Sequence, residues 1–355
     1  MGESRFAVEM AKLLPRPKPG REYHLNFYVR LRDATAWADA GHEIHRAQFA
    51  LPALAAIEIP VEQPAPAMLA GNDSEIVIRG EEGLEIVFDR RSGLIKRAAK
   101  GGVAYLLAGA SEALWRPQCG LDTDPHWGFY DLWLALAPDR LSRQVRNIGA
   151  FQLPDGRVRV EVEVRLTSSA SPFAIDSRIA YIISGKGKLR LEAEMNIARG
   201  FSHVPRVGLA LVLMPGFEDL EWFGRGPGES YADRKHHTLV GRYSSQVAAQ
   251  HFPFVPPSEC GGHEDTRWLR LRHENGAELT VCSAALFHFD ARHNSLLDYW
   301  LAQHDHELPQ RPEVYLHLDC RHAGIGGNMG WSTILANEHM VPAGVYRFAF
   351  DIELM

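Results

Sequence analysis

The sequence is poor in cysteine, and it has no long apolar run. Its four cysteines, at positions 119, 260, 282 and 320, lie far apart and form no C-x-x-C pair. This spacing excludes a disulfide framework and a cysteine-based zinc knuckle, and it indicates reduced thiols. No apolar stretch reaches the roughly 20 residues of a membrane-spanning helix, and no basic segment leads into an apolar one near the N-terminus. We therefore expect a cytoplasmic protein with no membrane partner.

An excess of positive charge is also missing. The chain carries 38 Lys and Arg against 44 Asp and Glu, which gives a net charge of −6. This balance suits solubility and argues against a nucleic-acid partner. With 355 residues, 46% of them hydrophobic, the chain can bury a sizeable core in one large domain or in two ordinary ones.

Helical periodicity is rare in this chain, and the best short helix candidate is Ser295 to Gln303. Apolar residues instead alternate with charged ones, most strictly over residues 158–166 and again over residues 189–197. This alternation is typical of strands with one buried and one wet face. The 31 glycines and 21 prolines fit many turns. The sequence predicts an all-β fold, a large antiparallel sandwich.

Residues 222–234 form the most distinctive segment, with the sequence W-F-G-R-G-P-G-E-S-Y-A-D-R. On composition alone it indicates a strand, a tight turn and a surface ion pair. The order of its residues, however, resembles the W-x-G-x-G-P-x-E-x-Y-x-D-R signature in the C-terminal region of the large β-galactosidases of glycoside hydrolase family two.

Four further segments resemble segments of the same family, in the same order along the chain. They are Thr35–Glu43, Leu114–Pro117 with Asp122–Asp124, Pro257–Gly261 with Arg267-Trp268, and Gly324–Trp331. The resemblance covers about residues 21 to 355 and implies the large antiparallel supersandwich fold shared with galactose mutarotases. Proline-rich stretches at residues 15–20 and 63–67 indicate the domain limits. We expect residues 1–20 to be a linker or disordered N-terminus, residues 21–66 a partial immunoglobulin-like sandwich, and residues 67–355 the supersandwich.

The family resemblance places the bond-breaking chemistry outside this chain. Retaining glycosidases use two carboxyl groups about 5 Å apart, and in this family both are glutamates of a (β/α)₈ barrel. The sequence has no βα alternation from which to build that barrel. The pair Asn337-Glu338 follows the wrong segment, and we expect Glu338 at the surface. We expect no catalytic residue and no cofactor here, since the family's Mg and Na belong to the absent barrel.

The resemblance does imply a contribution to substrate binding. Trp331 corresponds to the tryptophan that stacks on the aglycone part of a β-galactoside, and an indole face suits the C–H face of a sugar. Asp122 and Asp124 lie in a segment similar to the family's mobile active-site loop, although His126 and Trp127 depart from its pattern. Other motif residues are expected to join loops as Arg–carboxylate pairs: Arg225, Glu229, Asp233, Arg234, Glu259 and Arg267.

Seventeen histidines invite a metal interpretation. His236-His237 and the pair His304 and His306 are close in sequence, but a metal site needs three or four convergent ligands. We expect surface or hydrogen-bonded histidines and no metal. The chain is accordingly expected to fold without metal or disulfides.

Three functions remain open at this point. The first is the C-terminal portion, or small subunit, of a β-galactosidase acting with a barrel-bearing partner, and a homo-oligomer is compatible with it. The second is a free-standing aldose mutarotase or epimerase, which needs an acid/base pair such as His304 or His306 with Glu307. The third is a non-catalytic carbohydrate-binding module with an aromatic platform.

Overall fold

A computed structural model describes residues 20–51, 64–119, 133–326 and 335–355, together with Glu9, Lys18 and Asp122. The chain divides into two compact units, Met1–Glu62 and Gln63–Met355, and each is described by itself. Within the described residues, no helix has the length and apolar character needed to cross a membrane.

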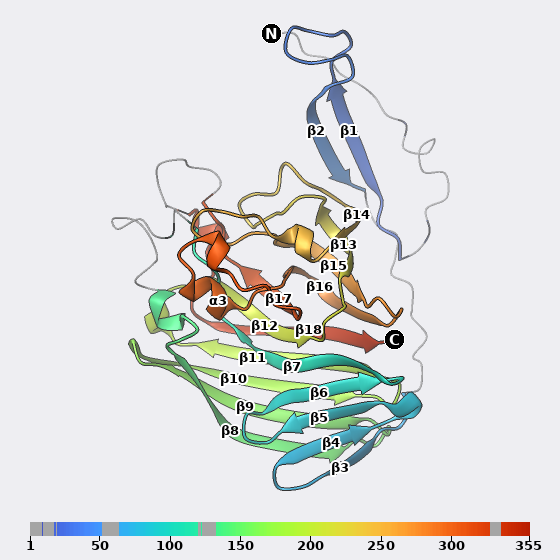
Figure 1. The fold of residues 1–355 in the computed structure, drawn as a ribbon, viewed down its shortest axis with the longest axis vertical. Coiled ribbons are helices and arrows are strands. Elements are labelled where there is room, and N and C mark those ends of the chain that lie inside the picture. Colours follow the sequence, from blue (N-terminus) through green and yellow to red (C-terminus); the bar gives the residue numbers. More distant parts are fainter. Residues whose placement is uncertain are drawn as a thin grey trace. The chain divides into compact units, whose positions relative to one another are not determined.

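The first unit contributes one hairpin of two antiparallel strands, β1 (His24–Arg30) and β2 (Glu43–Ala50) (Figure 1). Phe27 and Phe49 meet edge to face across the pair, with ring centroids 5.7 Å apart. Both side chains are exposed, and so is that of Tyr28, the next residue of β1 after Phe27. A two-stranded sheet with exposed apolar groups is at best marginally stable alone.

The second unit is built almost entirely from one 16-stranded antiparallel sheet. Its path runs β3-β4-β5-β6-β7-β12-β17-β16-β18-β11-β10-β9-β8, and β13, β14 and β15 branch from β16. The strands are β3 (Met68–Gly71), β4 (Glu75–Arg79), β5 (Glu85–Asp89), β6 (Leu94–Lys100), β7 (Val103–Ala113), β8 (Leu141–Gln152), β9 (Val158–Ser168), β10 (Ser171–Ile183), β11 (Lys188–Ile197), β12 (Arg206–Leu213), β13 (Asp219–Gly226), β14 (Leu239–Gln246), β15 (His263–Arg272), β16 (Glu278–Arg292), β17 (Val314–His322) and β18 (Val345–Leu354).

Helices are few and short. One α-helix is present among the described residues, α3 (Leu296–Leu301), and Ser295 caps it by accepting a hydrogen bond from the Asp298 amide. The helix lies inside the stretch predicted from the sequence. The 3-10 turns are Glu81–Gly83, Leu134–Leu136, Arg199–Phe201, Ala248–Gln250, Asp305–Glu307 and Asn337–His339.

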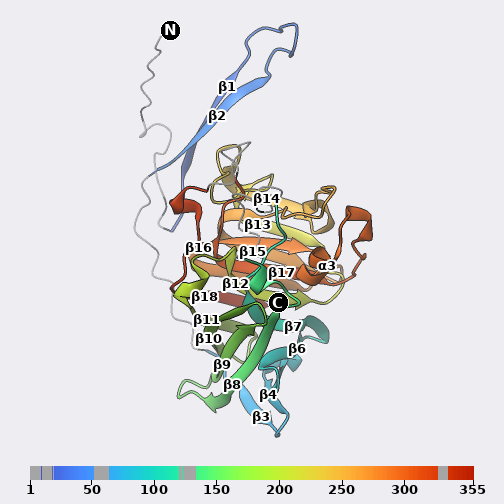
Figure 2. The same ribbon diagram turned by 90° about the vertical axis from the view of Figure 1, so that its left-hand side faces the viewer.

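The core of the second unit lies between two faces of this continuous sheet. Figure 2 shows β3–β7 on one side of the lower part and β8–β11 on the other. Phe88 of β5 packs edge to face on Tyr181 of β10, with ring centroids 4.8 Å apart. The Tyr181 hydroxyl donates to the Ala110 carbonyl of β7. Apolar burial of this kind is the main stabilising term of the fold.

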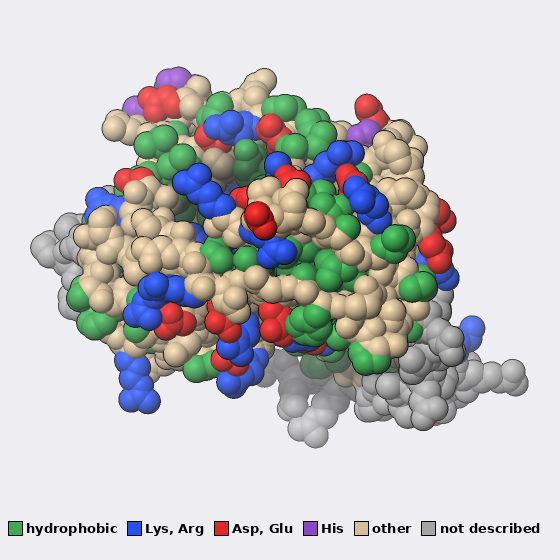
Figure 3. All heavy atoms as spheres, turned by 90° about the horizontal axis from the view of Figure 1, so that it is seen from below, with side chains coloured by type: hydrophobic (Ala, Val, Ile, Leu, Met, Phe, Trp, Pro, Cys, Tyr) green, Lys and Arg blue, Asp and Glu red, His purple; other side chains and the backbone are tan. Residues whose placement is uncertain are grey.

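The predicted alternation is confirmed on β9 and β11. Every second residue of β9, from Val158 to Leu166, is buried, and the charged residues between them face outward. The all-β antiparallel prediction is therefore confirmed. All four cysteines are free, as expected. On the surface, Figure 3 shows positive and negative side chains interspersed over one face.

Candidate functional site

β13 and the segment after it each carry one aromatic side chain that belongs to the core. Trp222 and Tyr231 are buried, and the Trp222 indole donates to the Arg225 carbonyl at 2.9 Å. The Tyr231 hydroxyl donates to Glu259 Oε1 at 3.3 Å and accepts from the Gly262 amide at 3.2 Å. These aromatics fix the backbone of the motif, and they are not available to a ligand.

Two of the predicted ion pairs join loops around this motif. Arg225 pairs with Asp265 and also donates to the carbonyls of Lys235 and Thr238. Glu229 pairs with Arg234 at 3.1 Å and accepts the Gly261 amide at 3.0 Å. Arg225 and Glu229 each link the motif to another segment, whereas Arg234 pairs within the motif.

Asp233 binds the backbone of a second segment. Its two carboxylate oxygens accept the amides of Ile325 and Gly326 at 3.0 and 2.8 Å. A Cβ added at Gly324 would lie 2.6 Å from the Asp233 carboxyl carbon, so this close approach requires glycine. Asp233 thus fixes the start of the glycine-rich segment Gly324–Trp331.

Arg116 holds the same segment from the other side. Its guanidinium donates to the carbonyls of Ala323 and Gly324 at 3.3 and 3.0 Å. It also contacts both oxygens of Asp122 at 3.1 Å, and Asp122 accepts the Cys119 amide. Arg116 and Asp122 are both buried. We call residues 323–326, held between Arg116 and Asp233, the clamped segment.

The remaining motif residues lie nearby. Glu259 is buried and pairs with Arg292 at 2.9 Å. Arg267 donates to the Asp265 carbonyl, and its guanidinium lies over the Phe223 ring at 5.2 Å from the centroid. Trp331 and Asp124 lie outside the described residues, so their predicted contact with substrate stays a prediction. So does the substrate contact of Asp122, whose carboxylate is held by Arg116.

Behind the motif lies a buried network of charges that the sequence patterns did not single out. Arg206 binds both oxygens of Asp319, at 3.0 and 2.6 Å, and reaches Asp290 at 2.8 Å. Arg292 extends the network from Asp290 to Glu259. Burial disfavours the charge on Asp290, but Arg292, His317 and Arg206 outweigh burial and hold the pKa of Asp290 well below its usual range.

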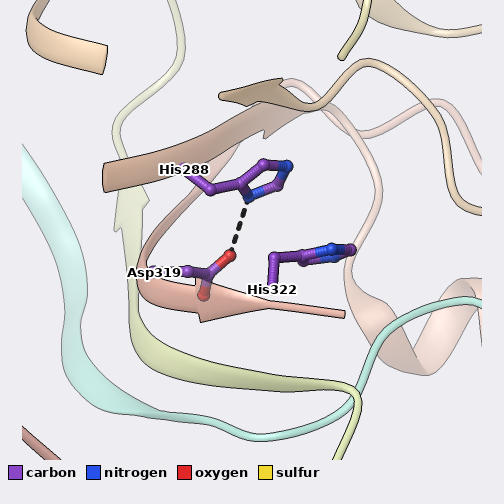
Figure 4. Close-up of side chains that lie close together, drawn as sticks. All are labelled: His288, Asp319 and His322. Atoms are coloured by element: carbon purple, nitrogen blue, oxygen red, sulfur yellow. Dashed lines mark hydrogen bonds and ion pairs between the residues drawn. The ribbon is translucent and has the colours of Figure 1, made fainter. Parts of the chain in front are cut away.

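Three side chains of this network carry metal-binding atom types within 4.8 Å of one another: His288, Asp319 and His322. His288 comes from β16, and the other two come from β17 (Figure 4). His288 Nδ1 lies 3.0 Å from Asp319 Oδ2, and His322 Nδ1 lies 2.9 Å from the Ala323 carbonyl oxygen. Burial, together with His288, Arg116 and Arg206, holds the pKa of His322 well below its usual range.

The histidines chosen from the sequence do not form such a group. His236 and His237 are exposed, and the rings of His304 and His306 stack at 5.5 Å on the surface. Glu338 is 78% exposed, as predicted. His288, Asp319 and His322 were missed because β16 and β17 bring together residues more than 30 positions apart. A weak signal was present: Asp319 follows the alternating run Val314–Leu318, and Asp290 follows Phe287-His288-Phe289.

The fold and these motifs define an all-β protein in which Arg116 and Asp233 hold the start of a glycine-rich segment. The family model described as beta galactosidase small chain matches residues 80–352, and the model described as beta-galactosidase, domain 4, matches residues 2–52. The chain belongs to the β-galactosidase small chain family. The resemblance seen in the sequence is therefore confirmed.

Known relatives extend well beyond the part matched here. A β-galactosidase of Vibrio cholerae is 28% identical over 344 residues, which are 95% of this chain and 32% of that protein. β-Galactosidase 2 of Enterobacter cloacae is 29% identical over 360 residues, 99% of this chain and 33% of that protein. The chain spans about a third of the length of these relatives.

Among solved structures, a galactose mutarotase related enzyme from Lactobacillus acidophilus is similar to this chain. The superposition covers 81% of this chain and 97% of that one, with 9% identity and a TM-score of 0.43.

Proposed function

We propose that this chain is the C-terminal portion, or a small subunit, of a β-galactosidase that hydrolyses terminal β-D-galactosides such as lactose. The observation that carries the proposal is the family match over residues 80–352 in a chain spanning about a third of its relatives. The remaining two thirds would supply the barrel, its two catalytic glutamates and the Mg and Na ions. This chain would complete the substrate site, in the cytoplasm.

The clamped segment suggests how it would do so. Asp233 takes the amides of Ile325 and Gly326, and Arg116 takes the carbonyls of Ala323 and Gly324. A segment bound on both backbone edges starts in a fixed direction, and Trp331 follows five residues after Gly326. Preorganised positioning of this kind improves binding without taking part in bond cleavage.

A free-standing mutarotase is the less favoured function. Such an enzyme needs an acid and a base that reach the sugar. His304 Nδ1 does lie 3.3 Å from Glu307 Oε1, but both side chains are exposed on the surface and line neither of the two cavities described. The group of His288, Asp319 and His322 is buried. The third function, a carbohydrate-binding module, would keep Trp331 but no partner.

Two assays of the purified chain separate these functions. We expect no turnover of a chromogenic β-galactoside and no acceleration of the mutarotation of α-D-galactose, followed by polarimetry. Accelerated mutarotation would favour the second function. Galactoside turnover that persists through purification, and is lost when a carboxylate of this chain is replaced, would overturn the proposal.

A further inference from the structure

Two buried imidazoles use one ring nitrogen each for a fixed hydrogen bond. His322 Nδ1 lies 2.9 Å from the Ala323 carbonyl oxygen, and His288 Nδ1 lies 3.0 Å from Asp319 Oδ2. A carbonyl and a carboxylate can only accept, so Nδ1 carries the proton in both rings. In the neutral tautomer the lone pair of each ring is then on Nε2.

These Nε2 atoms have no hydrogen-bond partner among the described residues, and both are buried. His288 is 2% exposed and His322 is 4% exposed. A buried polar atom nearly always has a partner, and two such atoms in neighbouring rings therefore indicate something that they bind. The ring centroids lie 4.2 Å apart at an interplanar angle of 27°, and Figure 4 shows the second nitrogens on the same side, away from Asp319.

The hydrogen bonds of the two Nδ1 atoms are of the kind that orient histidine ligands in metal sites. Histidines that bind metals usually donate the other ring N–H to a carboxylate or a backbone carbonyl, which fixes the ring. Asp319 is itself fixed by Arg206 at 3.0 and 2.6 Å. It is therefore occupied as an orienting group, and two imidazole nitrogens are left as ligands.

There is also space beside the rings. A Cβ added at Gly262 would lie 2.3 Å from His288 Nε2, so glycine leaves this nitrogen uncovered by a side chain. Both rings line a cavity of about 240 Å³ that is also lined by Glu264, Asp265 and His339. Water can fill the remaining coordination positions of an ion from such a polar cavity.

We propose that His288 and His322 bind one divalent transition-metal ion through their Nε2 atoms, with water completing its coordination. Imidazole nitrogen suits zinc, copper, nickel and cobalt, whereas magnesium and calcium require oxygen ligands. The sequence analysis expects no metal in this chain, because a site needs three or four convergent ligands. In the proposed site two of these ligands come from the protein, and water supplies the others. The metal-site proposal is independent of the proposed function.

The test is titration of the metal-free chain with Cu²⁺ or Co²⁺, followed by calorimetry and by the electron paramagnetic resonance spectrum of the copper form. We expect one ion per chain and hyperfine coupling from two imidazole nitrogens. His288→Gln and His322→Gln should each weaken binding at least about tenfold. The double variant His304→Gln/His306→Gln is the matched control, because that pair also stacks but is exposed. It should bind as the unchanged chain does.

Several results would overturn the site. One is the absence of stoichiometric binding of both Cu²⁺ and Co²⁺. Another is binding that survives both His288→Gln and His322→Gln, or that disappears in the His304/His306 control. Near-ultraviolet circular dichroism checks that each variant is folded. If neither single variant folds, the unchanged chain still decides the question, because a copper spectrum with fewer than two imidazole nitrogens contradicts the proposal.

Discussion

At the scale of single residues, Asp233 and Arg116 both bind the backbone of the clamped segment, although their charges are opposite. The carboxylate accepts two backbone amides of the clamped segment, and the guanidinium donates to two of its carbonyls. Charge-assisted hydrogen bonds of this kind are stronger than neutral ones. The motif residues therefore position backbone, and the side chain proposed to meet the substrate is Trp331.

Trp331→Ala should raise the KM for lactose in the assembled enzyme. Loss of an aromatic contact costs about 1–2 kcal/mol, roughly 5- to 30-fold in binding. The effect should be larger for the aglycone than for galactose, and kcat should change less than KM. Trp37→Ala is the control, because Trp37 is exposed in the first unit. If Trp331→Ala instead lowers the melting temperature and leaves the kinetics unchanged, then Trp331 is a packing residue.

His263 makes stability depend on pH. Burial lowers its pKa to about 3. The folded chain keeps His263 neutral, while the unfolded chain takes up a proton below about pH 6.5. Protonation therefore favours unfolding as the pH falls from about 6.5 towards 3, at about 1.4 kcal/mol per pH unit.

Urea unfolding at about pH 6 and pH 5, in the presence of a chelator, measures this slope. The His263→Phe variant should lose less stability over that step than the unchanged chain, by about 1.4 kcal/mol. His236→Phe, at an exposed position, should keep the full slope. Equal slopes in all three proteins would contradict the burial of a neutral His263.

At the scale of elements, the strands were predictable and the charge network was not. Alternation on β9 and β11 places one face in a core, which is a local property of the sequence. The network of Arg206, Asp290 and Asp319 depends on which strands become neighbours. β12 pairs with β17, and β17 pairs with β16, although their residues are far apart in the chain. The spacing of residues in the sequence does not show which of these strands pair.

The motif segments show the same division. Their order identified the family, but it did not give the partner of each charged residue. The amides that Asp233 binds could not be found from the sequence, because every residue except proline carries a backbone amide. The sequence did not predict that His288 and His322 lie together, because they belong to different strands, β16 and β17.

Asp233→Ala should loosen the clamped segment. It leaves two amides without their acceptor, which costs about 1–3 kcal/mol where those groups remain buried. In the assembled enzyme the KM should rise with it, because the segment leads to Trp331, and Asp233→Asn should have a smaller effect. Asp176→Ala, which breaks an exposed pair with Arg165 on β9 and β10, should change stability by less than about 1 kcal/mol. An unchanged KM in folded Asp233→Ala would contradict the positioning role.

At the scale of the whole molecule, the chain has an all-β fold and spans about a third of the length of the β-galactosidases that it matches. Among the described residues, five buried carboxylates are each paired with arginine: Asp122, Glu259, Asp290, Asp298 and Asp319. The sixth, Asp233, accepts two backbone amides. A carboxylate held in this way is not free to attack a sugar or transfer a proton to it. This arrangement supports the proposal that the reacting groups come from the remainder of the enzyme.

Complementation measures that proposal most directly. The part of the Vibrio cholerae relative that lies outside the region matched here is mixed with this chain and assayed for lactose hydrolysis. The relative's own missing region serves as the positive control. We expect neither part to hydrolyse lactose alone and the mixture to do so. Hydrolysis by this chain alone, or no activity and no association in a mixture whose positive control works, would contradict the account.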